Sequence, residues 1–326
     1  MSELPSGAGS GAATPHVAAA SAGGGKWLWS NGEIREAAGA SLSVWANVAH
    51  YGSGVFEGIR CYPTERGPAV FRLLDHMKRL HRSARYYGLN LRWTAEELSA
   101  ATLALIRKDG CQAGYIRPLV YFGEGPIQLT PKVRCPTEAL ILVRPMGAYL
   151  GEENAEKGLR LTVSTWRKFH AQAVPTTAKG CGQYANSVIA AHEAFDRGYD
   201  EALLLNHDGT VAEGTGENVF FVRGGEVVTN DAASCILMGI TRDSVLTLCR
   251  EAGLPVTVRP FNLSELLEAD EVFLTGTAAE VQLVRELDGR SYPVGEGTVA
   301  SRLRRRYRDV IHGRVPEHHP WLSFAG

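Results

Sequence analysis

A lysine surrounded by small residues is the first group in this sequence that is suited to covalent chemistry. Lys179 lies in the segment Val-Pro-Thr-Thr-Ala-Lys-Gly-Cys-Gly-Gln-Tyr-Ala-Asn-Ser, residues 174–187, with Gly180 and Gly182 beside it. Glycines leave room for a bulky ligand close to the backbone, and a desolvated lysine has a lowered pKa and a nucleophilic amine. Tyr184 follows closely enough for its hydroxyl to return to the same site. Residue types alone favour an exposed lysine in a Gly-rich loop.

Three segments further along the chain favour a catalytic role for Lys179 over an exposed lysine in a loop. Residues 213–218, Glu-Gly-Thr-Gly-Glu-Asn, place two carboxylates in a strand interrupted by glycine; a carboxylate that faces a pyridine nitrogen keeps it protonated and makes the ring an electron sink. Residues 238–243 open a predicted helix, and helix N-termini bind phosphate. Residues 275–280, Thr-Gly-Thr-Ala-Ala-Glu, follow a predicted buried strand and present backbone amides in a turn. Turn chemistry explains each segment singly, but not their joint occurrence in this order.

The sequence from about residue 27 to residue 312 resembles the class IV aminotransferases, which have PLP fold type IV, and among them the prokaryotic branched-chain amino-acid aminotransferases. The motifs that carry the resemblance are residues 50–60, 70–73, 75–80, 115–118, 147–151, 174–187, 213–218, 239–242 and 276–280. The resemblance implies pyridoxal 5'-phosphate as the cofactor, bound at the interface of two domains.

The resemblance assigns residues to that cofactor. Lys179 is similar to the catalytic lysine that carries the cofactor as a Schiff base and moves the proton. Glu213 is similar to the carboxylate that pairs with the pyridine nitrogen, and Tyr184 to the tyrosine that bonds the phenolic oxygen. The other implied cofactor-binding residues are Arg72, Ile240, Thr241 and Thr277 around the phosphate, and Leu237 against the ring. No metal site is implied.

The resemblance also assigns substrate-binding residues. They are Tyr115, Thr277 and Ala278 for the α-carboxylate, Tyr51, Arg117 and Tyr149 for the side-chain carboxylate of glutamate, and Phe56 and Met146 for the pocket wall. Without the resemblance, the residue types favour a structural ion pair for Arg117 and core packing for the aromatic residues. In the family Tyr51 reaches in from a partner subunit, which implies a homodimer or a higher homo-oligomer.

The implied reaction is transamination between a branched-chain or related apolar L-amino acid and 2-oxoglutarate, in a ping-pong sequence through pyridoxamine phosphate. Three departures from the family bear on the substrate. Met146 stands where an aromatic residue is usual, and the loop at 123–130 differs from the usual Gly- and Met-containing loop. Residues 229–234 lack the prolines that are often found there. Alternatives are therefore a class IV lyase acting on an aminodeoxychorismate-like substrate, a D-amino-acid or specialised-pathway transaminase, and a cofactor-binding protein without turnover.

The elements that must position these residues are of mixed type. Hydrophobic periodicity predicts strands near 69–72, 115–122, 139–143, 159–166, 202–205, 219–222, 227–229, 256–259 and 271–274, and helices near 73–87, 95–109, 184–197, 241–251 and 299–311. Asn31-Gly32 predicts a hairpin turn, and Thr94 with Glu97 a capping box. The expected fold class is α+β or mixed α/β. The expected organisation is a disordered extension over 1–25, a small α/β domain over 26–144, a linker over 145–158 and a large cofactor-binding domain over 159–326.

Composition limits the other possibilities. The chain has 326 residues and a formal net charge of -1, so there is no basic excess to neutralise the phosphates of a nucleic acid. No apolar run approaches the roughly 20 residues that span a bilayer. Six scattered cysteines without a Cys-x-x-Cys pair are typical of a reducing cytoplasm. We therefore expect a soluble cytoplasmic enzyme with small-molecule amino acids and 2-oxo acids as its partners.

Overall fold

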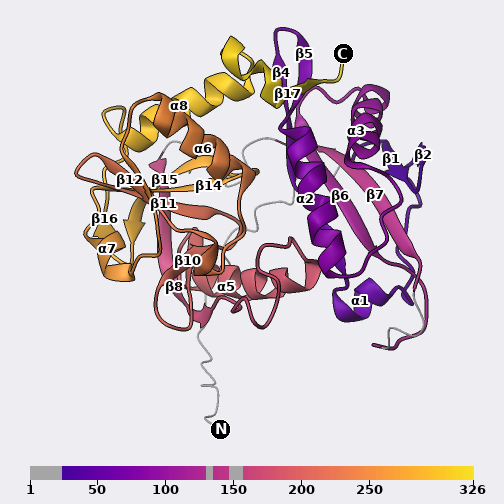
Figure 1. The fold of residues 1–326 in the computed structure, drawn as a ribbon, viewed down its shortest axis with the longest axis horizontal. Coiled ribbons are helices and arrows are strands. Elements are labelled where there is room, and N and C mark those ends of the chain that lie inside the picture. The colour runs from indigo at the N-terminus through magenta and orange to yellow at the C-terminus, as the bar shows by residue number, and fades with distance from the viewer. Residues whose placement is uncertain (1–23, 130–134, 147–156) are drawn as a thin grey trace, which may run out of the picture.

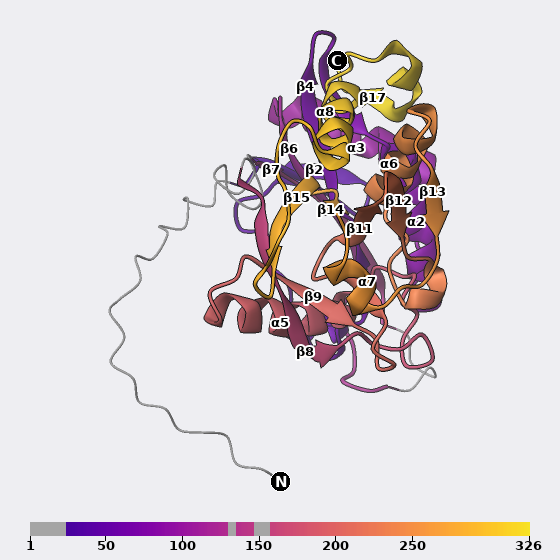
Figure 2. The same cartoon turned by 90° about the vertical axis from the view of Figure 1, so that its left-hand side faces the viewer.

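Two β-sheets with helices packed on them form the molecule. The computed structural model describes residues 24–129, 135–146 and 157–326. Figure 1 shows the sheets side by side, with the first half of the chain in indigo and magenta and the second half in orange and yellow. In the view turned by 90°, α8 and β17 lie at the same end of the molecule as β4 (Figure 2). Within the described ranges, no helix is long and apolar enough to cross a membrane.

The first sheet has eight strands in the order β17-β5-β4-β6-β7-β1-β2, with β3 paired to β6. Its strands are β1 (Trp27–Ser30), β2 (Glu33–Glu36), β3 (Gly54–Phe56), β4 (Ile59–Thr64), β5 (Gly67–Phe71), β6 (Gly114–Phe122), β7 (Thr137–Pro145) and β17 (Leu322–Phe324). The helices of this half are α1 (Asn47–Tyr51), α2 (Leu73–Tyr86) and α3 (Ala95–Asp109). Residues of α2 and α3 share one apolar core with strands β3, β4, β6 and β7.

The second sheet has nine strands in the order β10-β9-β8-β15-β14-β11-β12-β13, with β16 paired to β15. Its strands are β8 (Leu159–Arg167), β9 (Glu201–Leu205), β10 (Val211–Gly214), β11 (Asn218–Arg223), β12 (Glu226–Thr229), β13 (Val256–Val258), β14 (Glu271–Gly276), β15 (Glu280–Leu287) and β16 (Arg290–Ser291). The helical segments are α5 (Tyr184–Asp196), α6 (Ile240–Glu251), α7 (Leu263–Leu267), α8 (Val299–Ile311) and the 3₁₀ turns η1 (Cys181–Gln183), η2 (Ala232–Ser234) and η3 (Pro316–Trp321).

A shared core ties the two halves together. Tyr62, Ala69 and Phe71 of the first sheet pack in one cluster with buried residues of α6, α8 and the second sheet. The chain then returns from α8, and β17 pairs antiparallel with β5 in the first sheet (Figure 1). The last strand thus belongs to the sheet of the first half. The division of the chain at 145–158 remains a prediction, since most of that segment lies outside the described residues.

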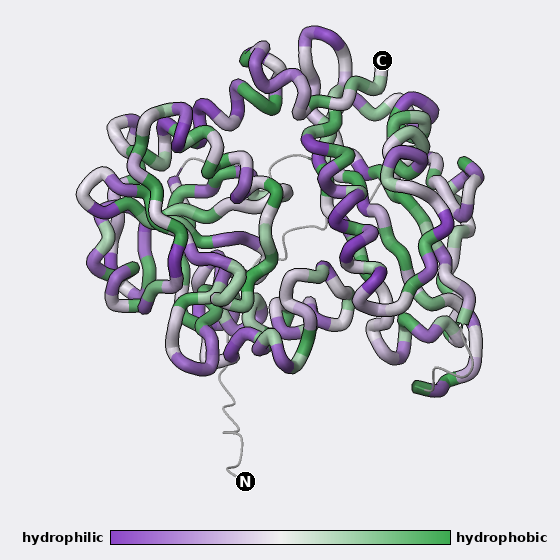
Figure 3. Tube along the Cα trace, in the orientation of Figure 1, coloured by the Kyte–Doolittle hydropathy of each residue, from purple (hydrophilic) through white to green (hydrophobic). Residues whose placement is uncertain are grey.

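The mixed fold and its local signals agree with the sequence. Asn31 and Gly32 both have positive φ, 50° and 107°, as the turn between β1 and β2 requires. Hydropathy in Figure 3 is highest along the strands inside each half and lowest along outer loops and exposed helix faces, because the strands bury their side chains. The elements that the sequence did not predict include strands β3, β4, β10, β15 and β17 and helix α7.

The capping box at the start of α3 gives a first test of local stability. The hydroxyl of Thr94 accepts from the amide of Glu97, whose carboxylate accepts from the amide of Thr94. Replacing Thr94 by alanine is expected to lower the free energy of unfolding by about 1 kcal/mol, because the reciprocal hydrogen bonds that cap the helix are lost. Urea unfolding measures the change. An unaltered midpoint would contradict it.

Candidate active site

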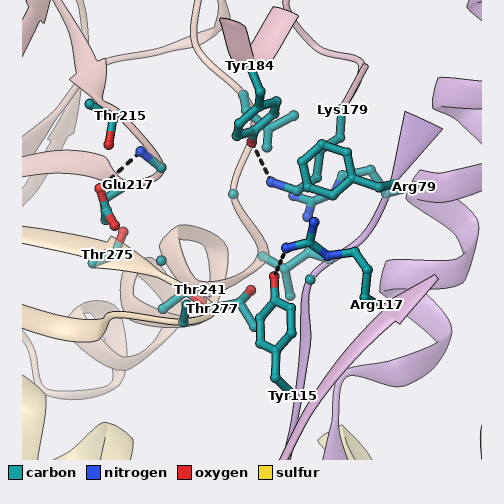
Figure 4. A pocket seen from close by; sticks show the side chains of 18 of the residues that line it. Arg79, Tyr115, Arg117, Lys179, Tyr184, Thr215, Glu217, Thr241, Thr275 and Thr277 are labelled. Atoms are coloured by element: carbon teal, nitrogen blue, oxygen red, sulfur yellow. Dashed lines mark hydrogen bonds between the residues drawn. The ribbon is translucent and has the colours of Figure 1, made fainter. Parts of the chain in front are cut away.

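A cavity of about 1170 Å³ lies between the two sheets. Strands β6 and β7 of the first sheet form one wall, and the segments around β10, β14 and the start of α6 form the other. Figure 4 shows side chains from both halves pointing into this space, with Lys179, Arg79 and Arg117 on one side and Glu217, Thr215 and Thr275 across from them. The cavity therefore brings together residues from distant parts of the sequence.

Lys179 is fixed by its backbone and directed into the cavity. Its amide donates to the hydroxyl of Ser83 at 3.0 Å, and its carbonyl accepts from the amide of Phe56 at 3.0 Å. The amine lies 2.5 Å from the hydroxyl of Tyr184 and 4.9 Å from the centre of the Phe56 ring. Burial, together with the nearby Arg79 guanidinium, lowers the pKa of Lys179 to about 8. The amine is thus prepared to act as a nucleophile near neutral pH.

The glycine beside Lys179 serves the protein rather than a ligand. A Cβ atom on Gly180 would lie 2.0 Å from the hydroxyl of Tyr87, so the space that the sequence assigns to a ligand is filled by this tyrosine. The hydroxyl of Tyr87 accepts in turn from the side-chain amide of Gln183. Gly180 is therefore required because Tyr87, which directly follows α2, packs against the loop.

Tyr184 and Glu213 lie in the cavity wall as the sequence predicts. Burial, with a contribution from Glu213, raises the pKa of Tyr184 well above its usual value, so its hydroxyl keeps its proton. The Oε2 atom of Glu213 accepts from the side chain of Asn218 and from the amide of Leu237, each at 3.1 Å. Its Oε1 atom lies 2.6 Å from the amine of Lys168. Three donors thus fix the orientation of the Glu213 carboxylate.

Lys168 has no role in the sequence-based prediction. It directly follows the end of β8, and its side chain is largely buried against Glu213. Burial alone would lower the pKa of Lys168, but the contact with Glu213 outweighs burial and raises it. Nothing in the sequence around Lys168 marks this pairing, since Glu213 is distant along the chain.

Arg72, which the resemblance assigns to the phosphate, lies outside the cavity. Arg72 stands at the N-cap of α2, where it pairs with Asp75 at 2.6 Å and Asp243 at 2.5 Å and lies over the Trp321 ring. It is not among the residues that line the cavity, whereas Arg79 is. Two acidic partners and an aromatic ring hold the Arg72 guanidinium between α2 and α6, so it stays outside the cavity.

Arg79 is oriented by a buried ionic network. Its Nε and Nη2 atoms donate to Glu57 at 2.7 and 2.8 Å, and Nη1 donates to the carbonyl of Met238 at 3.1 Å. His76 contacts the same carboxylate through Nδ1 at 2.7 Å. Burial by itself would raise the pKa of Glu57, but Arg79 and His76 hold it well below its usual range. The motif at 75–80 contains Arg79, but only the fold shows that it faces the cavity.

The start of α6 presents backbone donors to the cavity. Gly239 is the N-cap, no side chain of a described residue caps this end, and Ile240 and Thr241 line the cavity wall. A Cβ atom on Gly239 would lie 2.1 Å from the side-chain oxygen of Asn218, so only glycine fits between the helix and the residue that holds Glu213. A helix N-terminus beside an arginine and threonine hydroxyls suits a phosphate group.

The other predicted residues divide into three groups. Leu237, Thr277, Ala278, Phe56, Tyr115, Arg117 and Met146 line the cavity. Tyr51 does not line it in its own chain; it lies on α1 with 38% of its surface exposed. Tyr149 lies outside the described residues. The roles of these residues toward a ligand remain predictions.

A second carboxylate in the cavity wall has no predicted role. Glu217 is buried, its Oε2 atom accepts from the amide of Gly216 at 3.0 Å, and it lies near Glu201. Burial and the charge of Glu201 raise the pKa of Glu217 well above its usual value. Glu213, by contrast, forms an ion pair with Lys168.

Comparisons with known proteins agree with this geometry. The family model described as amino-transferase class IV matches residues 54–287. The branched-chain-amino-acid aminotransferase of Escherichia coli (strain K12) is 38% identical over 300 residues, covering 91% of this chain and 96% of its own. The crystal structure of the branched-chain aminotransferase from Thermoproteus uzoniensis with norvaline is 39% identical with a TM-score of 0.88, and it covers 93% of this chain and 100% of its own.

One further solved structure contains a cofactor derivative. It is the T.th. branched-chain amino acid aminotransferase complexed with N-(5'-phosphopyridoxyl)-L-glutamate, which is 40% identical with a TM-score of 0.87 and covers 93% of this chain and 99% of its own. The family match, the sequence relatives and the solved structures all point to one group of enzymes. This chain belongs to the class IV aminotransferase family.

Proposed function

We propose that this enzyme transfers an amino group between a branched-chain or related apolar L-amino acid and 2-oxoglutarate, using pyridoxal 5'-phosphate in a ping-pong reaction. The observation that carries the proposal is the partly buried amine of Lys179, 2.5 Å from the Tyr184 hydroxyl, in a cavity that also contains the ion-paired Glu213. Membership of the class IV aminotransferases supports the reaction type.

The residues of the cavity fit this cofactor. When bound, pyridoxal phosphate supplies an aldehyde for Lys179 and a ring that accepts the electrons released at the substrate's α-carbon. Arg79, Thr241, Thr277 and the N-terminus of α6 would hold its phosphate. Glu213 would face the ring nitrogen, Tyr184 the phenolic oxygen, and Leu237 a face of the ring. Arg79 takes here the role that the sequence assigned to Arg72.

Lys179 is the residue that moves the proton. Its Nζ atom accepts the proton from the α-carbon of the amino acid and then donates a proton to the carbon that bears the amino group in the pyridoxamine form. The hydroxyl of Tyr184 and the guanidinium of Arg79 lie close to this amine, and neither takes the proton from it, because one is a neutral donor and the other is permanently charged. Lys168 and Asn218 hold the carboxylate of Glu213 in place.

The opposite wall suits two kinds of side chain. Phe56, Leu119, Leu142 and Met146 offer apolar surface, and the guanidinium of Arg117 lies 4.5 Å from the centre of the Phe56 ring. Arg117 is able to pair with a carboxylate when glutamate or 2-oxoglutarate is bound. Tyr115 and the backbone turn at Thr277 and Ala278 would receive the α-carboxylate. The norvaline complex of one relative and the glutamate adduct of another support a pocket for both classes of substrate.

The lowered pKa of Lys179 predicts how the cofactor-free protein takes up pyridoxal phosphate. Only the neutral amine attacks an aldehyde, so the uptake rate should rise as the pH increases through about 8 and then level off. An ordinary lysine, with a pKa of about 10.4, would continue to gain rate well above that. Rapid-mixing absorbance across the neutral and alkaline range measures the profile, with Lys179→Ala giving the background. A profile that keeps rising to the ordinary lysine pKa would contradict the burial of this amine.

The reaction itself is tested by two half-reactions. Cofactor-loaded protein mixed with L-leucine, and separately with L-glutamate, should convert the bound cofactor to its pyridoxamine form, and added 2-oxoglutarate should return it to the aldehyde. Conversion by glutamate alone would point to a specialised amino donor. Conversion by D-amino acids only would favour a D-amino-acid transaminase. Release of pyruvate from an aminodeoxychorismate-like substrate, with the cofactor left in its aldehyde form, would favour a class IV lyase.

We also propose a homodimer in a reducing cytoplasm. The segment before α1 exposes three large apolar side chains, those of Leu42, Val44 and Trp45. A β-bridge between Ala46 and Glu124 joins this segment to a loop that exposes Ile127 and Leu129. Exposed apolar surface of this kind favours contact between subunits. In a dimer, Tyr51 of each subunit would reach the cavity of the other subunit, since it does not line the cavity of its own chain. The six free cysteines are typical of a reducing compartment. Light scattering of the eluting protein tests the dimer.

A further inference from the structure

One wall of the cavity carries two arginines on adjacent strands. Strands β6 and β7 pair antiparallel, with Tyr115 opposite Arg144 and Arg117 opposite Leu142. Directly opposed residues share a face of the sheet, and so do residues two apart on one strand. All four residues line the cavity. Arg117 and Arg144 are therefore diagonal neighbours on the same cavity-facing surface, within reach of one ligand group given the length of their side chains.

Neither arginine is neutralised by the described residues around it. The Nη2 atom of Arg117 donates to the hydroxyl of Tyr115 at 2.9 Å, its Nε atom is buried without a hydrogen-bond partner, and no carboxylate among the described residues pairs with it. Arg144 is exposed at the end of β7 and likewise forms no ion pair with a described residue. By contrast, Arg79 in the same cavity is bound to Glu57.

The carboxylates of the cavity lie elsewhere. Those that line it in the described part of the chain are Glu213 and Glu217, which come from the opposite wall (Figure 4 shows Glu217 there). Glu213 is paired with Lys168, and Glu217 is buried beside Glu201. Within the described ranges, the β6–β7 wall thus has two positive charges that no carboxylate offsets, and they favour an anionic group of the ligand at this place.

We propose that Arg144 is a specificity-determining residue that, together with Arg117, binds the distal carboxylate of dicarboxylic substrates. This inference rests on the proposed transamination and specifies which dicarboxylic 2-oxo acids serve as amino-group acceptors. Arg117 contacts Phe56, whose ring adjoins Lys179, so it is the inner member of the pair. Arg144 adjoins Pro145 and Met146 at the exposed end of β7 and is the outer member. The site therefore suits five- and six-carbon dicarboxylic 2-oxo acids, and the contribution of Arg144 increases with their length.

The test compares oxo acids of different length in the Arg144→Gln holoenzyme. We expect the ratio of kcat/KM for 2-oxoglutarate to kcat/KM for the apolar 2-oxohexanoate to fall about 5- to 10-fold. The corresponding ratio for 2-oxoadipate should fall further. Both ratios fall because the variant loses one charge-assisted contact to a partly exposed carboxylate. The change should appear in KM rather than kcat. Arg144→Lys should retain part of the preference, since it keeps the charge but not the planar fork.

A binding measurement separates recognition from turnover. Calorimetry of glutarate and adipate with the holoenzyme should show weaker binding by Arg144→Gln, and increasing salt should weaken the binding of adipate to the wild-type protein. The matched control is Arg302→Gln, which removes the same charge from an exposed position on α8 outside the cavity wall. It should leave both ratios and both affinities as in the wild type.

Two outcomes would overturn the proposal. Equal losses for 2-oxoglutarate and 2-oxohexanoate would make Arg144 a structural residue, and unchanged kinetics and affinities would make it a solvated arginine. Failure of the proposed function gives a different result, because the wild-type protein would then not convert its cofactor with either L-leucine or L-glutamate. That half-reaction is measured first, on the same preparation.

Discussion

Replacement of Lys179 by alanine is expected to slow transamination by about 10³-fold or more. The variant loses the amine that attacks the cofactor aldehyde and the same amine that moves the α-proton. The neighbouring donors do not replace it, because Tyr184 holds its proton tightly and Arg79 remains charged. The measurement is the single-turnover conversion of bound cofactor after mixing with L-glutamate.

The control for this variant is Lys78→Ala, on the exposed face of α2 beside the cavity arginine. It removes a lysine without removing a cavity group and should leave the conversion rate as in the wild type. A small primary amine added to Lys179→Ala should restore part of the rate, since a diffusing base then takes the proton. Full turnover by Lys179→Ala without added amine would refute the assignment of the catalytic lysine.

Replacement of Glu57 by alanine is expected to lower the free energy of unfolding by about 3–5 kcal/mol. Glu57 is fully buried and accepts from Arg79 and His76. Without Glu57, the buried guanidinium of Arg79 loses most of its hydrogen bonds and its ion pair. Leaving a charge unpaired in the interior lowers the free energy of unfolding far more than the loss of a surface ion pair does. Chemical unfolding measures the change, with Thr94→Ala as a reference for a mild local loss.

A double variant distinguishes stability from cofactor binding. Glu57→Leu combined with Arg79→Met replaces the buried pair by apolar groups of similar size and should recover most of the lost stability. It should nevertheless retain pyridoxal phosphate poorly, because Arg79 lines the cavity and Met cannot bind a phosphate. If Glu57→Ala were no less stable than Thr94→Ala, the ionic network would contribute little. If the double variant bound the cofactor normally, Arg79 would not be the phosphate residue.

Local signals in the sequence were sufficient for much of the fold. The capping box of Thr94 and Glu97 and the hairpin at Asn31-Gly32 depend on residues within one turn of each other, and the structure has both. The same holds for Lys179 and Tyr184, which the 3₁₀ turn η1 between them brings into contact. Interactions between neighbours in sequence leave a pattern of residue types, so they are predictable from that pattern.

The choice between Arg72 and Arg79 needed the tertiary structure. The two arginines lie seven residues apart, Arg72 at the N-cap of α2 and Arg79 within the helix, and residue type does not distinguish them. The partners that separate them are distant in sequence: Asp243 and Trp321 hold Arg72, and Glu57 holds Arg79. Only the packing of α2 against α6 and β3 decides which guanidinium faces the cavity.

The elements with clear local periodicity, and the segments that supply most of the site, could be predicted from the sequence. Four contacts are visible only in the folded chain: the pairing of Lys168 with Glu213, the packing of Tyr87 against Gly180, the placement of Arg144 beside Arg117 on one wall, and the return of β17 to the first sheet. These contacts join segments that are far apart along the chain. These contacts stabilise the protein through burial and charge pairing, which exist only in the folded chain. A local pattern of residue types does not show which distant segment supplies the partner of a side chain.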